Sequence, residues 1–576
     1  MVPQFRFSPA AQPPLRIGIM LDSSKPSGFF AQVIEDIQAS NFAKIELLVY
    51  RKKSSAPKPP NSRLANWTER LLDSNKRKRL FYEMYQRIDQ PNQGANHPLT
   101  SVDCTERLAG IERIEVEPIG KKFVHRFPDD ALQQIRAKNL DVLLRFGFNI
   151  LHGDILKAAR YGVWSYHHGD NDFYRGGPAL FWELPEHSPL SGVLLQVLTE
   201  ELDGGLVLCK SLFSTERTLS LAKNRYVPYW GSTDMVIRKL NELHQFGWEH
   251  VRQRSVPAAP YQGKRQIYRT PTNLEMLRWL GPAAMKKAAS RVFQNQKKTV
   301  QHWRIGIRMK AAQPLGSAAD HHMHMQDFRW IEPPPGHFWA DPFAIELDGK
   351  YWAYFEDYSY QTSVGRIACA EIAADGTLIS PASCIEQPGK HYSYPCVFRF
   401  GADLFMVPES GGSNSTDLYR CEEFPAKWAR QSTLLQGKFV DTTIWQQNGL
   451  WWLMTTSAQP DSRAGSLLLF YADSPLGEWK FHPANPISTD IRTNRGAGQI
   501  FWADGKWIRP SQSGCPNYGR SFSLNEITEL SPQRYAERPI TSVEPWGTLC
   551  GVHTYNRVGP VELIDGATMT PRSQVE

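Results

Sequence analysis

The sequence predicts an α/β doubly wound domain followed by an all-β five-bladed propeller. Apolar strands alternate with amphipathic helices in the first half, whereas the second half repeats a strand–turn–strand unit. The 576 residues also exceed the roughly 250 to 300 that a single core accommodates. We therefore expect a disordered lead-in at 1–14, the α/β domain at 15–255, a helical connector at 256–325 and the propeller at 326–576.

The α/β prediction rests on the order of apolar patterns along residues 15–168. Strands are predicted at 15–21, 44–50, 140–148 and 163–168, and helices at 28–40, 129–139 and 150–162. Such an alternation gives a parallel sheet, and ligands of these sheets bind beyond the carboxyl ends of the strands. His167, His168 and Asp170 stand at such an end.

The propeller prediction rests on four similar segments, each a strand, a tight turn and a strand. Their turns centre on Gly349, Ala402, Gly449 and Gly505, a spacing of about 50 residues that is typical of propeller blades. A fifth unit begins near Gly551. We expect the segment just before residue 338 to complete its outer strands, so that the ring closes without free edges.

Composition narrows the functional classes. With 41% hydrophobic and 22% charged residues, and no apolar stretch of about 20 residues, we expect no integral membrane segment. The first residues carry no apolar core of a signal peptide, so a cytoplasmic location is expected. The formal net charge is +8, but the basic run from Arg51 to Lys58 has few aromatic neighbours, which favours a solvated insertion over a nucleic-acid partner.

The eight cysteines show neither Cys-x-x-Cys nor zinc-like Cys/His spacing. We therefore expect reduced thiols and no metal.

The richest polar stretch runs from Trp164 to Gly205. It places His167 at a strand end and Asp203 further along, and such a pair can act as a base and its charge partner. Taken alone, an isolated histidine pair is more often structural than catalytic.

The order of motifs in this stretch resembles the folate-dependent formyltransferase family over roughly residues 15–250. The matching motifs are Ser165-Tyr166-His167, then Tyr174-Arg175-Gly176-Gly177-Pro178, then Leu202-Asp203-Gly204-Gly205. The preceding FGFNIL matches the family's pterin-binding loop. The resemblance implies 10-formyltetrahydrofolate as the formyl donor, bound by Phe146, Gly147, Phe148, Ile150 and Leu151.

The resemblance also implies catalytic roles. His167 would assist proton removal or polarise the tetrahedral intermediate, and Asp203 would hold that histidine. Ser165 stands where the family has an asparagine that stabilises the developing oxyanion. Asn171 on the following loop is an alternative source of that amide.

An acceptor pocket is predicted around His168, Asp170, Asn171 and Arg175, where the family has mostly apolar loop residues. The alternative is a loop that only satisfies its own backbone. Because a propeller replaces the family's tRNA-binding barrel, we expect an amino-sugar, nucleotide-sugar or glycolipid acceptor, and no nucleic acid.

In the propeller, Asp341, Glu409 and Asp441 fall on inner strands of different blades and are predicted to converge. Converging carboxylates serve glycoside cleavage. Neighbouring aromatic residues would stack on sugars; they are Trp339, Tyr392, Tyr394 and Trp445. The alternative is that the acids cap turns and the aromatic rings fill the layers between blades.

Residues 335–560 resemble five-bladed arabinanases and xylosidases, and more closely the N-terminal domain of glucosamine inositolphosphorylceramide transferases. The match lies in FWADPF, SYPCVF, MVPES, FVDTTIW and ADSPLGEWKFHPANPI. It implies glycan handling rather than a defined reaction.

Together these features predict an N-formyltransferase that acts on an amino sugar in glycan or glycolipid biosynthesis, with the propeller binding the sugar. Two alternatives stay open. One is a carbohydrate-binding protein with an inactive transferase half, and the other is a propeller glycosidase.

Overall fold

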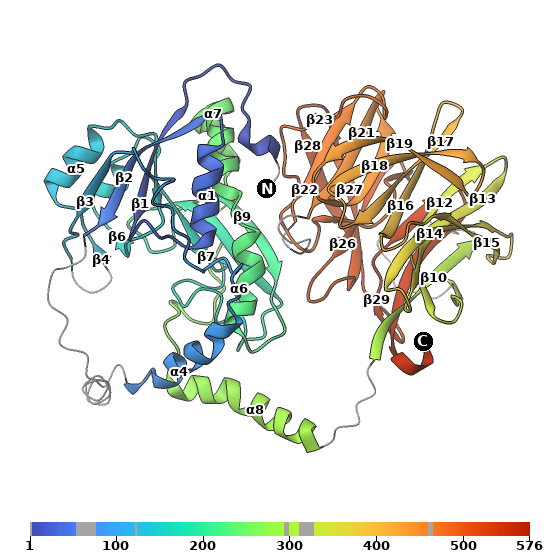
Figure 1. Ribbon diagram of the computed structural model, residues 1–576, viewed down its shortest axis with the longest axis horizontal. Helices are drawn as coiled ribbons and strands as arrows, with labels where there is room; N and C mark the ends of the chain where they lie inside the picture. Colours follow the sequence, from blue (N-terminus) through green and yellow to red (C-terminus); the bar gives the residue numbers. More distant parts are fainter. Residues whose placement is uncertain are drawn as a thin grey trace. The chain divides into compact units, whose positions relative to one another are not determined.

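The computed structural model describes residues 3–52, 77–120, 124–257, 259–292, 299–309, 328–458, 463 and 465–575, with side chains of 283–292 excepted. The chain forms two compact units, Met1–Gln294 (unit 1) and Asn295–Glu576 (unit 2) (Figure 1).

Unit 1 is built on a seven-stranded sheet of order β3-β2-β1-β5-β7-β8-β9. The pairs from β3 to β7 are parallel, and β8 and β9 are antiparallel additions. Its elements are η1 (Pro3–Arg6), β1 (Leu15–Leu21), α1 (Gly28–Gln38), β2 (Ala43–Arg51), α4 (Leu80–Asp89), η2 (Gln90–Asn92), β3 (Arg113–Val116), β4 (Val124–His125), α5 (Asp129–Arg136), β5 (Val142–Arg145), β6 (Ile150–Leu151), η3 (Asp154–Lys157), β7 (Val163–His168), β8 (Leu190–Val197), β9 (Leu206–Ser214), α6 (Leu221–Trp230), α7 (Met235–Gln253) and α8 (Asn273–Val292).

Helices cover both faces of this sheet. On one face, Met20 and Leu143 pack with Leu132 and Ile135 of α5 in a single core cluster. On the other face, α1 and α7 lie side by side (Figure 1), and the ring of Phe29 on α1 meets Tyr166 of β7 edge to face. The carboxyl ends of β1, β5 and β7 therefore meet at one edge of the sheet.

Two expectations for the first half are wrong, and a third is not tested. The lead-in is ordered, because Phe5 is buried and the Asn241 amide donates to the carbonyls of Phe5 and Phe7. The helix expected at 150–162 is only the short η3, which starts after Gly153 at a φ of 81°. The basic run expected to be solvated lies, from residue 53 onward, outside the described residues.

The expected helical connector at 256–325 is also wrong in part. Helix α8 is present, but Thr299–Met309 forms β10, which pairs along its whole length with β31 of the propeller. Unit 2 therefore begins before residue 326. Trp303, Ile305, Ile307 and Met309 alternate along β10 as in a strand, but the partner strand β31 lies at the far end of the chain.

Unit 2 contains five sheets, and the five-bladed propeller is confirmed. Its strands are β10 (Thr299–Met309), β11 (Arg329–Ile331), β12 (His337–Leu347), β13 (Lys350–Ser359), β14 (Val364–Ile372), β15 (Leu378–Ile385), β16 (His391–Phe400), β17 (Asp403–Gly411), β18 (Ser415–Glu423), β19 (Lys427–Gln436), β20 (Phe439–Gln447), β21 (Leu450–Ser457), β22 (Leu467–Ala472), β23 (Lys480–Phe481), β24 (Arg495–Gly496), β25 (Phe501–Ala503), β26 (Lys506–Ser513), β27 (Ser521–Leu530), β28 (Tyr535–Val543), β29 (Leu549–Gly551), β30 (Tyr555–Val558) and β31 (Val561–Pro571), followed by η6 (Arg572–Gln574).

The ring closes in one blade made from both ends of unit 2. Strands β29, β30 and β31 come from its C-terminal end, and β10 and β11 come from its N-terminal end. At the junction Arg308 of β10 and Glu562 of β31 are register partners and form a buried ion pair. The Tyr555 hydroxyl donates to the other Glu562 oxygen at 2.8 Å.

No helix in the described parts of the chain is both long and apolar enough to cross a lipid bilayer. All eight cysteines are free thiols.

We predict that Arg308→Met destabilises the propeller by about 3 to 5 kcal/mol, because it leaves the buried Glu562 carboxylate without its cation. Denaturant unfolding followed by tryptophan fluorescence measures the loss. The double variant Arg308→Met/Glu562→Leu should regain most of it. A single variant as stable as the unmodified protein would show that this pair does not hold the ring closed.

Candidate functional site

The first candidate site lies at the carboxyl end of β7. The Nδ1 atom of His167 lies 3.3 Å from Oδ1 of Asp203, which sits in the turn between β8 and β9. The other Asp203 oxygen accepts the backbone N–H of Gly176 at 3.0 Å. The structure thus brings His167, Asp203 and the Tyr174–Pro178 loop together.

The second ring nitrogen of His167 is also engaged. Nε2 lies 2.9 Å from the carbonyl oxygen of Tyr174. Burial opposes the charge of the ring, but Asp203 and the Tyr174 carbonyl outweigh it, so the pKa of His167 is raised. An acceptor at both nitrogens favours the doubly protonated ring, in which the Nε2 proton already has a partner.

A cation stands beside this pair that the sequence reasoning missed. Arg145 ends β5, and its Nε donates to Oγ of its register partner Ser165 at 2.9 Å. Its Nη1 donates to the carbonyl of Asn149 at 3.0 Å. Burial lowers the pKa of Arg145 while the Asp203 carboxylate favours its charge. An arginine at the end of the otherwise apolar LDVLLR run was the available signal.

The predicted folate-binding loop is only partly available to a ligand. Phe146 stacks on Phe30 with ring centroids 4.4 Å apart. Phe146 and Ile150 are both half-buried. Phe148 and Leu151 instead belong to the core cluster beneath α5, so their side chains cannot line a pocket. Gly147 approaches β1 closely, since a Cβ there would lie 2.6 Å from the backbone nitrogen of Asp22.

The predicted acceptor residues mostly satisfy one another. The Lys210 ammonium holds Asp170 at 2.7 Å and Asp172 at 2.6 Å. Arg175 donates from Nε to the carbonyl of Asn171 at 3.0 Å. This arrangement favours the alternative in which the loop stabilises itself.

His168 points away from its neighbour His167 along β7. Its ring stacks on Tyr229 of α6 with centroids 3.8 Å apart, and burial holds its pKa well below the usual value. It is therefore a neutral packing residue.

Glu183 is a buried acid near His167 that the sequence reasoning also missed. Burial raises its pKa to about 7, and the positive charge of His167 acts against this rise. Within the described residues its Oε1 atom has no hydrogen-bond partner. Glu183 is therefore a group that changes charge near neutral pH beside the imidazolium.

The second candidate site lies on the inner strands of the propeller. Asp341, Tyr394 and Asp441 each have a positive φ, of 50°, 46° and 52°, and each sits where the first hairpin of its blade shifts register. A bulge of this kind turns a side chain out of the normal alternation. These three positions are therefore equivalent in the first three blades, whereas the fourth blade has no register shift between Arg495 and Gly496.

One half of this site is an acid–imidazole network at the ring closure. Oδ1 of Asp341 accepts the Thr554 hydroxyl at 2.9 Å and lies 3.4 Å from Nε2 of His553. Nδ1 of His553 lies 2.7 Å from Asp565, which also accepts the backbone N–H of Asp341 at 3.0 Å.

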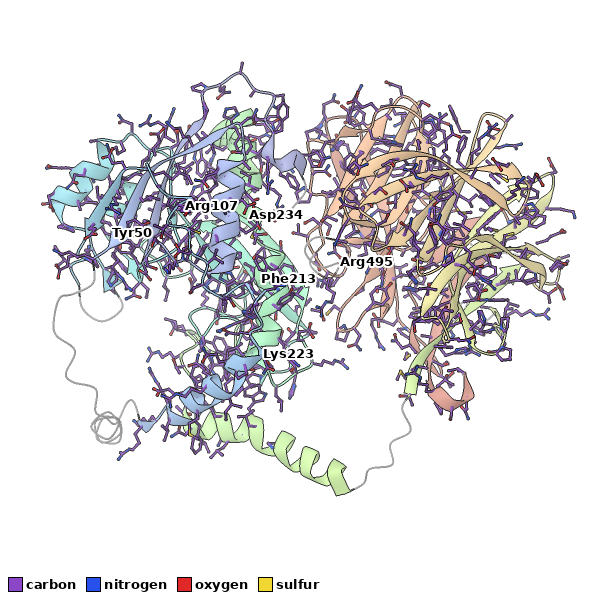
Figure 2. All side chains as sticks on the ribbon, in the orientation of Figure 1. Tyr50, Arg107, Phe213, Lys223, Asp234 and Arg495 are labelled. Carbon is purple, nitrogen blue, oxygen red and sulfur yellow. The ribbon has the colours of Figure 1, made fainter. Side chains whose placement is uncertain are left out.

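The other half joins two acids to a guanidinium. Glu409 accepts the backbone N–H of Asp441 at 3.2 Å, and Nε of Arg495 donates to the Asp441 carboxylate at 2.5 Å. The guanidinium also lies over the ring of Tyr518, 5.0 Å from its centroid. Figure 2 labels Arg495, which begins the fourth blade.

Burial is the largest cause of the raised pKa values of the acids in this site. It raises the pKa of Glu409 to about 8, with Asp441 adding to the rise, and that of Asp341 to about 6. Burial also raises the pKa of Glu356 well above its usual value. His553 behaves oppositely: burial disfavours its charge, but Asp565 and Asp341 raise its pKa to about 9.

The aromatic residues expected to stack on sugars are interior. Trp339, Tyr392, Tyr394 and Trp445 are all buried, so they fill the propeller instead. Tyr518, which is half exposed beside Arg495, is the aromatic ring that a ligand can reach.

Asp341, His553 and Asp565 offer ligand atoms within 4.8 Å of one another, a spacing compatible with a metal ion. His553 is protonated near neutral pH, however, and its imidazolium already supplies a cation to both carboxylates. A metal would have to displace that proton.

The comparisons with known proteins concern mainly unit 2. Residues 329–545 match the family described as "Glucosamine inositolphosphorylceramide transferase 1, N-terminal". Glucosamine inositolphosphorylceramide transferase 1 of Arabidopsis thaliana is 32% identical over 207 residues, which are 35% of this chain and 27% of that protein. The protein of the same name from Oryza sativa subsp. japonica is 30% identical over 210 residues, 36% of this chain and 28% of that protein. The chain thus spans less than a third of these relatives.

Solved structures are similar at a lower level. Phosphoribosylglycinamide formyltransferase from Bacillus halodurans has a TM-score of 0.28 and 14% identity, covering 41% of this chain and 97% of that one. Zg3597, a family 117 glycoside hydrolase from Zobellia galactanivorans, has a TM-score of 0.31 and 12% identity, covering 47% and 91%. These scores are too low to assign either fold.

We predict that the free energy of unfolding of unit 2 falls as the pH rises from 6.5 to about 9. His553 has a folded pKa of about 9 against 6.5, so its stabilisation is complete below 6.5 and is lost through 9. Glu409 has a folded pKa of about 8 against 4.5, so its stabilisation is complete below 4.5 and is lost through 8. The two losses add between pH 6.5 and 8, where the fall should be on the order of 2 kcal/mol per pH unit.

Glu409→Gln should roughly halve this slope, whereas Glu478→Gln, at an exposed position, should leave it unchanged. Denaturant unfolding at both ends of the pH range measures the slopes. Equal slopes for Glu409→Gln and the unmodified protein would contradict the burial of an acid with a raised pKa.

Proposed function

We propose that unit 1 transfers a formyl group from 10-formyltetrahydrofolate to the amine of an amino sugar, in cytoplasmic glycan or glycolipid biosynthesis, while the propeller holds the glycan. The observation that supports this most strongly is the buried His167–Asp203 pair with Arg145 and Ser165 beside it. These groups gather at the carboxyl ends of β5 and β7, where an α/β sheet binds its ligand.

The residues around the donor site fit a folate in part. Phe146 and Ile150 keep accessible surface, but Phe148 and Leu151 do not contribute side chains, and the backbone N–H groups of Phe146, Phe148 and Asn149 already have partners. The folate would supply the formyl carbon that the acceptor amine attacks. The fit therefore relies on the side chains of Phe146 and Ile150 more than the sequence suggested.

Arg145 takes over the role of the family asparagine. As a new C–N bond forms, negative charge collects on the formyl oxygen, and a fixed cation in a buried site stabilises it more than in water. Ser165 carries one hydroxyl, and Arg145 orients it through Nε. The guanidinium thus positions Ser165 and supplies the positive charge.

His167 acts as a proton donor. Its Nε2 proton passes to the leaving folate nitrogen as the old C–N bond breaks, and the ring recovers a proton from the attacking amine, so protons balance. Asp203 keeps the imidazolium charged and oriented. For this exchange the Tyr174 carbonyl must give up its hydrogen bond to Nε2, so a movement of that loop gates the reaction.

The propeller's relatives support an amino-sugar substrate, because their name joins glucosamine to a phosphorylated ceramide. In unit 2, the half-exposed Tyr518 ring lies beside the buried ion pair of Arg495 and Asp441. An accessible aromatic ring packs on a sugar ring. We therefore place the glycan at Tyr518.

We predict that the purified chain converts 10-formyltetrahydrofolate and an amino-sugar acceptor to tetrahydrofolate and an N-formyl sugar, measured by mass spectrometry. His167→Gln should lower the rate about 100-fold or more, since a positioned acid–base group contributes that much. Arg145→Met should cost a similar factor through lost oxyanion stabilisation.

Adding Ser165→Asn to Arg145→Met should restore part of the rate by returning the family's amide. His187→Gln, on an exposed loop residue of the same unit, is the matched control. Direct binding of a reduced-folate analogue is the companion measurement. Transfer undiminished in His167→Gln would refute the mechanism, and absence of both folate binding and transfer would refute the function.

A propeller glycosidase is the second candidate, favoured by one observation. Glu409, with a pKa of about 8, stays protonated at neutral pH and could serve as the acid, with the ionised Asp341 carboxylate across the site. We expect any sugar release from a glycan panel to disappear in Asp341→Asn and in Glu409→Gln. No release from any glycan by the unmodified protein would remove this candidate.

A further inference from the structure

Helices α4 and α8 of unit 1 carry an exposed apolar face that neither candidate site uses. We call it the α4–α8 face and define it by Phe81, Met84 and Ile88 on α4 and Leu274 and Leu277 on α8. Ile88 is 75% exposed, and the other four are between 36% and 56% exposed. Large apolar side chains gathered in this way mark an interaction surface.

The face is unusual because α4 is apolar on two sides. Its inward side, with Tyr82 and Tyr85, packs in a core cluster with Phe181 and Met276. A surface helix normally turns polar residues outward. Here the outward positions 81, 84 and 88 follow the three- and four-residue spacing of a second apolar stripe.

The two helices are held rigidly against each other. The side chain of Asn273, at the start of α8, accepts the backbone N–H of Phe81 and donates to the carbonyl of Arg77, at 2.9 and 2.8 Å. The rings of Tyr85 and Trp279 meet edge to face. Figure 1 shows α4 and α8 side by side at one end of unit 1.

A groove of about 630 Å³ opens in this face. Its walls are Phe81, Met84, Ile88, Leu219, Leu277 and Leu280. The polar groups at its floor are already satisfied: the Tyr85 hydroxyl donates to the Leu219 carbonyl, and Asp89 accepts from Ser220 and from the backbone N–H of Ala222. The groove therefore offers an occupant apolar contact only.

Basic side chains surround the face. They are Arg77, Lys78, Arg79, Arg87, Lys223 and Arg278, all exposed, with Lys223 labelled in Figure 2. None of the six forms an ion pair within the described part of the chain. Of the acids nearby, Asp89 is buried, Glu275 is held by Arg265, and Glu83 lies on α4 between Arg79 and Arg87. The rim thus carries more basic than acidic side chains.

We propose that the α4–α8 face docks unit 1 onto the surface of an anionic phospholipid bilayer. Exposed apolar side chains ringed by lysine and arginine are what an interfacial helix presents to a membrane. The basic rim complements anionic headgroups, and the apolar stripe and groove enter the headgroup–acyl boundary. This inference does not depend on formyl transfer.

Vesicle co-sedimentation of the full chain tests the proposal. Vesicles of phosphatidylcholine with phosphatidylserine should bind the protein, and vesicles of phosphatidylcholine alone should bind it far less. Because each basic residue near such a surface strengthens partitioning about fivefold, Arg77→Gln/Lys78→Gln/Arg79→Gln should weaken binding roughly 100-fold. Raised salt should also weaken the binding of the unmodified protein to the anionic vesicles.

Ile88→Ser/Leu277→Ser should lower partitioning by at least about tenfold, since apolar burial is lost. Ile379→Ser, at an apolar residue of unit 2 that is 46% exposed, is the control. These substitutions lie on the surface, so circular dichroism should show unchanged folding.

Two results overturn the proposal. One is equal binding of the unmodified protein and Ile88→Ser/Leu277→Ser to anionic vesicles, which would place the lipid contact elsewhere. The other is absence of vesicle binding together with a dimer, measured by analytical ultracentrifugation, that Ile88→Ser/Leu277→Ser dissociates. That outcome would make the face an interface between copies of this chain.

Discussion

Buried charge that must be paired inside the protein is the constraint on which both candidate sites depend. An isolated ion in a protein interior costs several kcal/mol, so it either finds a partner or gives up its charge. In unit 1, the buried His167 is paired with Asp203. In unit 2, Arg495 and His553 are the cations that pair with buried acids. Where burial outweighs the nearby cations, the pKa of the acid rises, to about 8 for Glu409 and to about 7 for Glu183.

This constraint decides what the His167 site can do. A histidine with acceptors at both nitrogens is a donor, which removes the role of a resting base. Arg145 adds a second fixed cation next to Ser165. The site is therefore arranged to stabilise negative charge, and acyl transfer is chemistry that develops such charge.

The sequence predicted the number of blades, the ends of the strands and the carboxylates on the inner strands, because apolar alternation and turn residues are local signals. It missed what depends on distant segments coming together. Strand β10 pairs with β31, almost the whole of unit 2 away, and His553 and Asp565 join Asp341 only through that closure. The arginine that ends the apolar LDVLLR run was visible in the sequence, but its contact with Ser165 depends on the pairing of β5 with β7. Phe148 lies in the core at a positive φ, and its backbone N–H donates to Asp22, which follows β1 far away in the sequence.

The loop that carries Tyr174 links the structural and catalytic demands on unit 1. Three contacts hold it in place. The Tyr174 carbonyl and the Gly176 N–H form hydrogen bonds with His167 and Asp203, and Lys210 forms an ion pair with Asp170. The first two involve the very groups that would carry out proton transfer. Substrate must therefore compete with the loop for one imidazolium proton, and an acceptor that fails to reach His167 leaves the loop closed. Specificity then arises from this exchange, because only a ligand that replaces the lost hydrogen bond opens the site without cost.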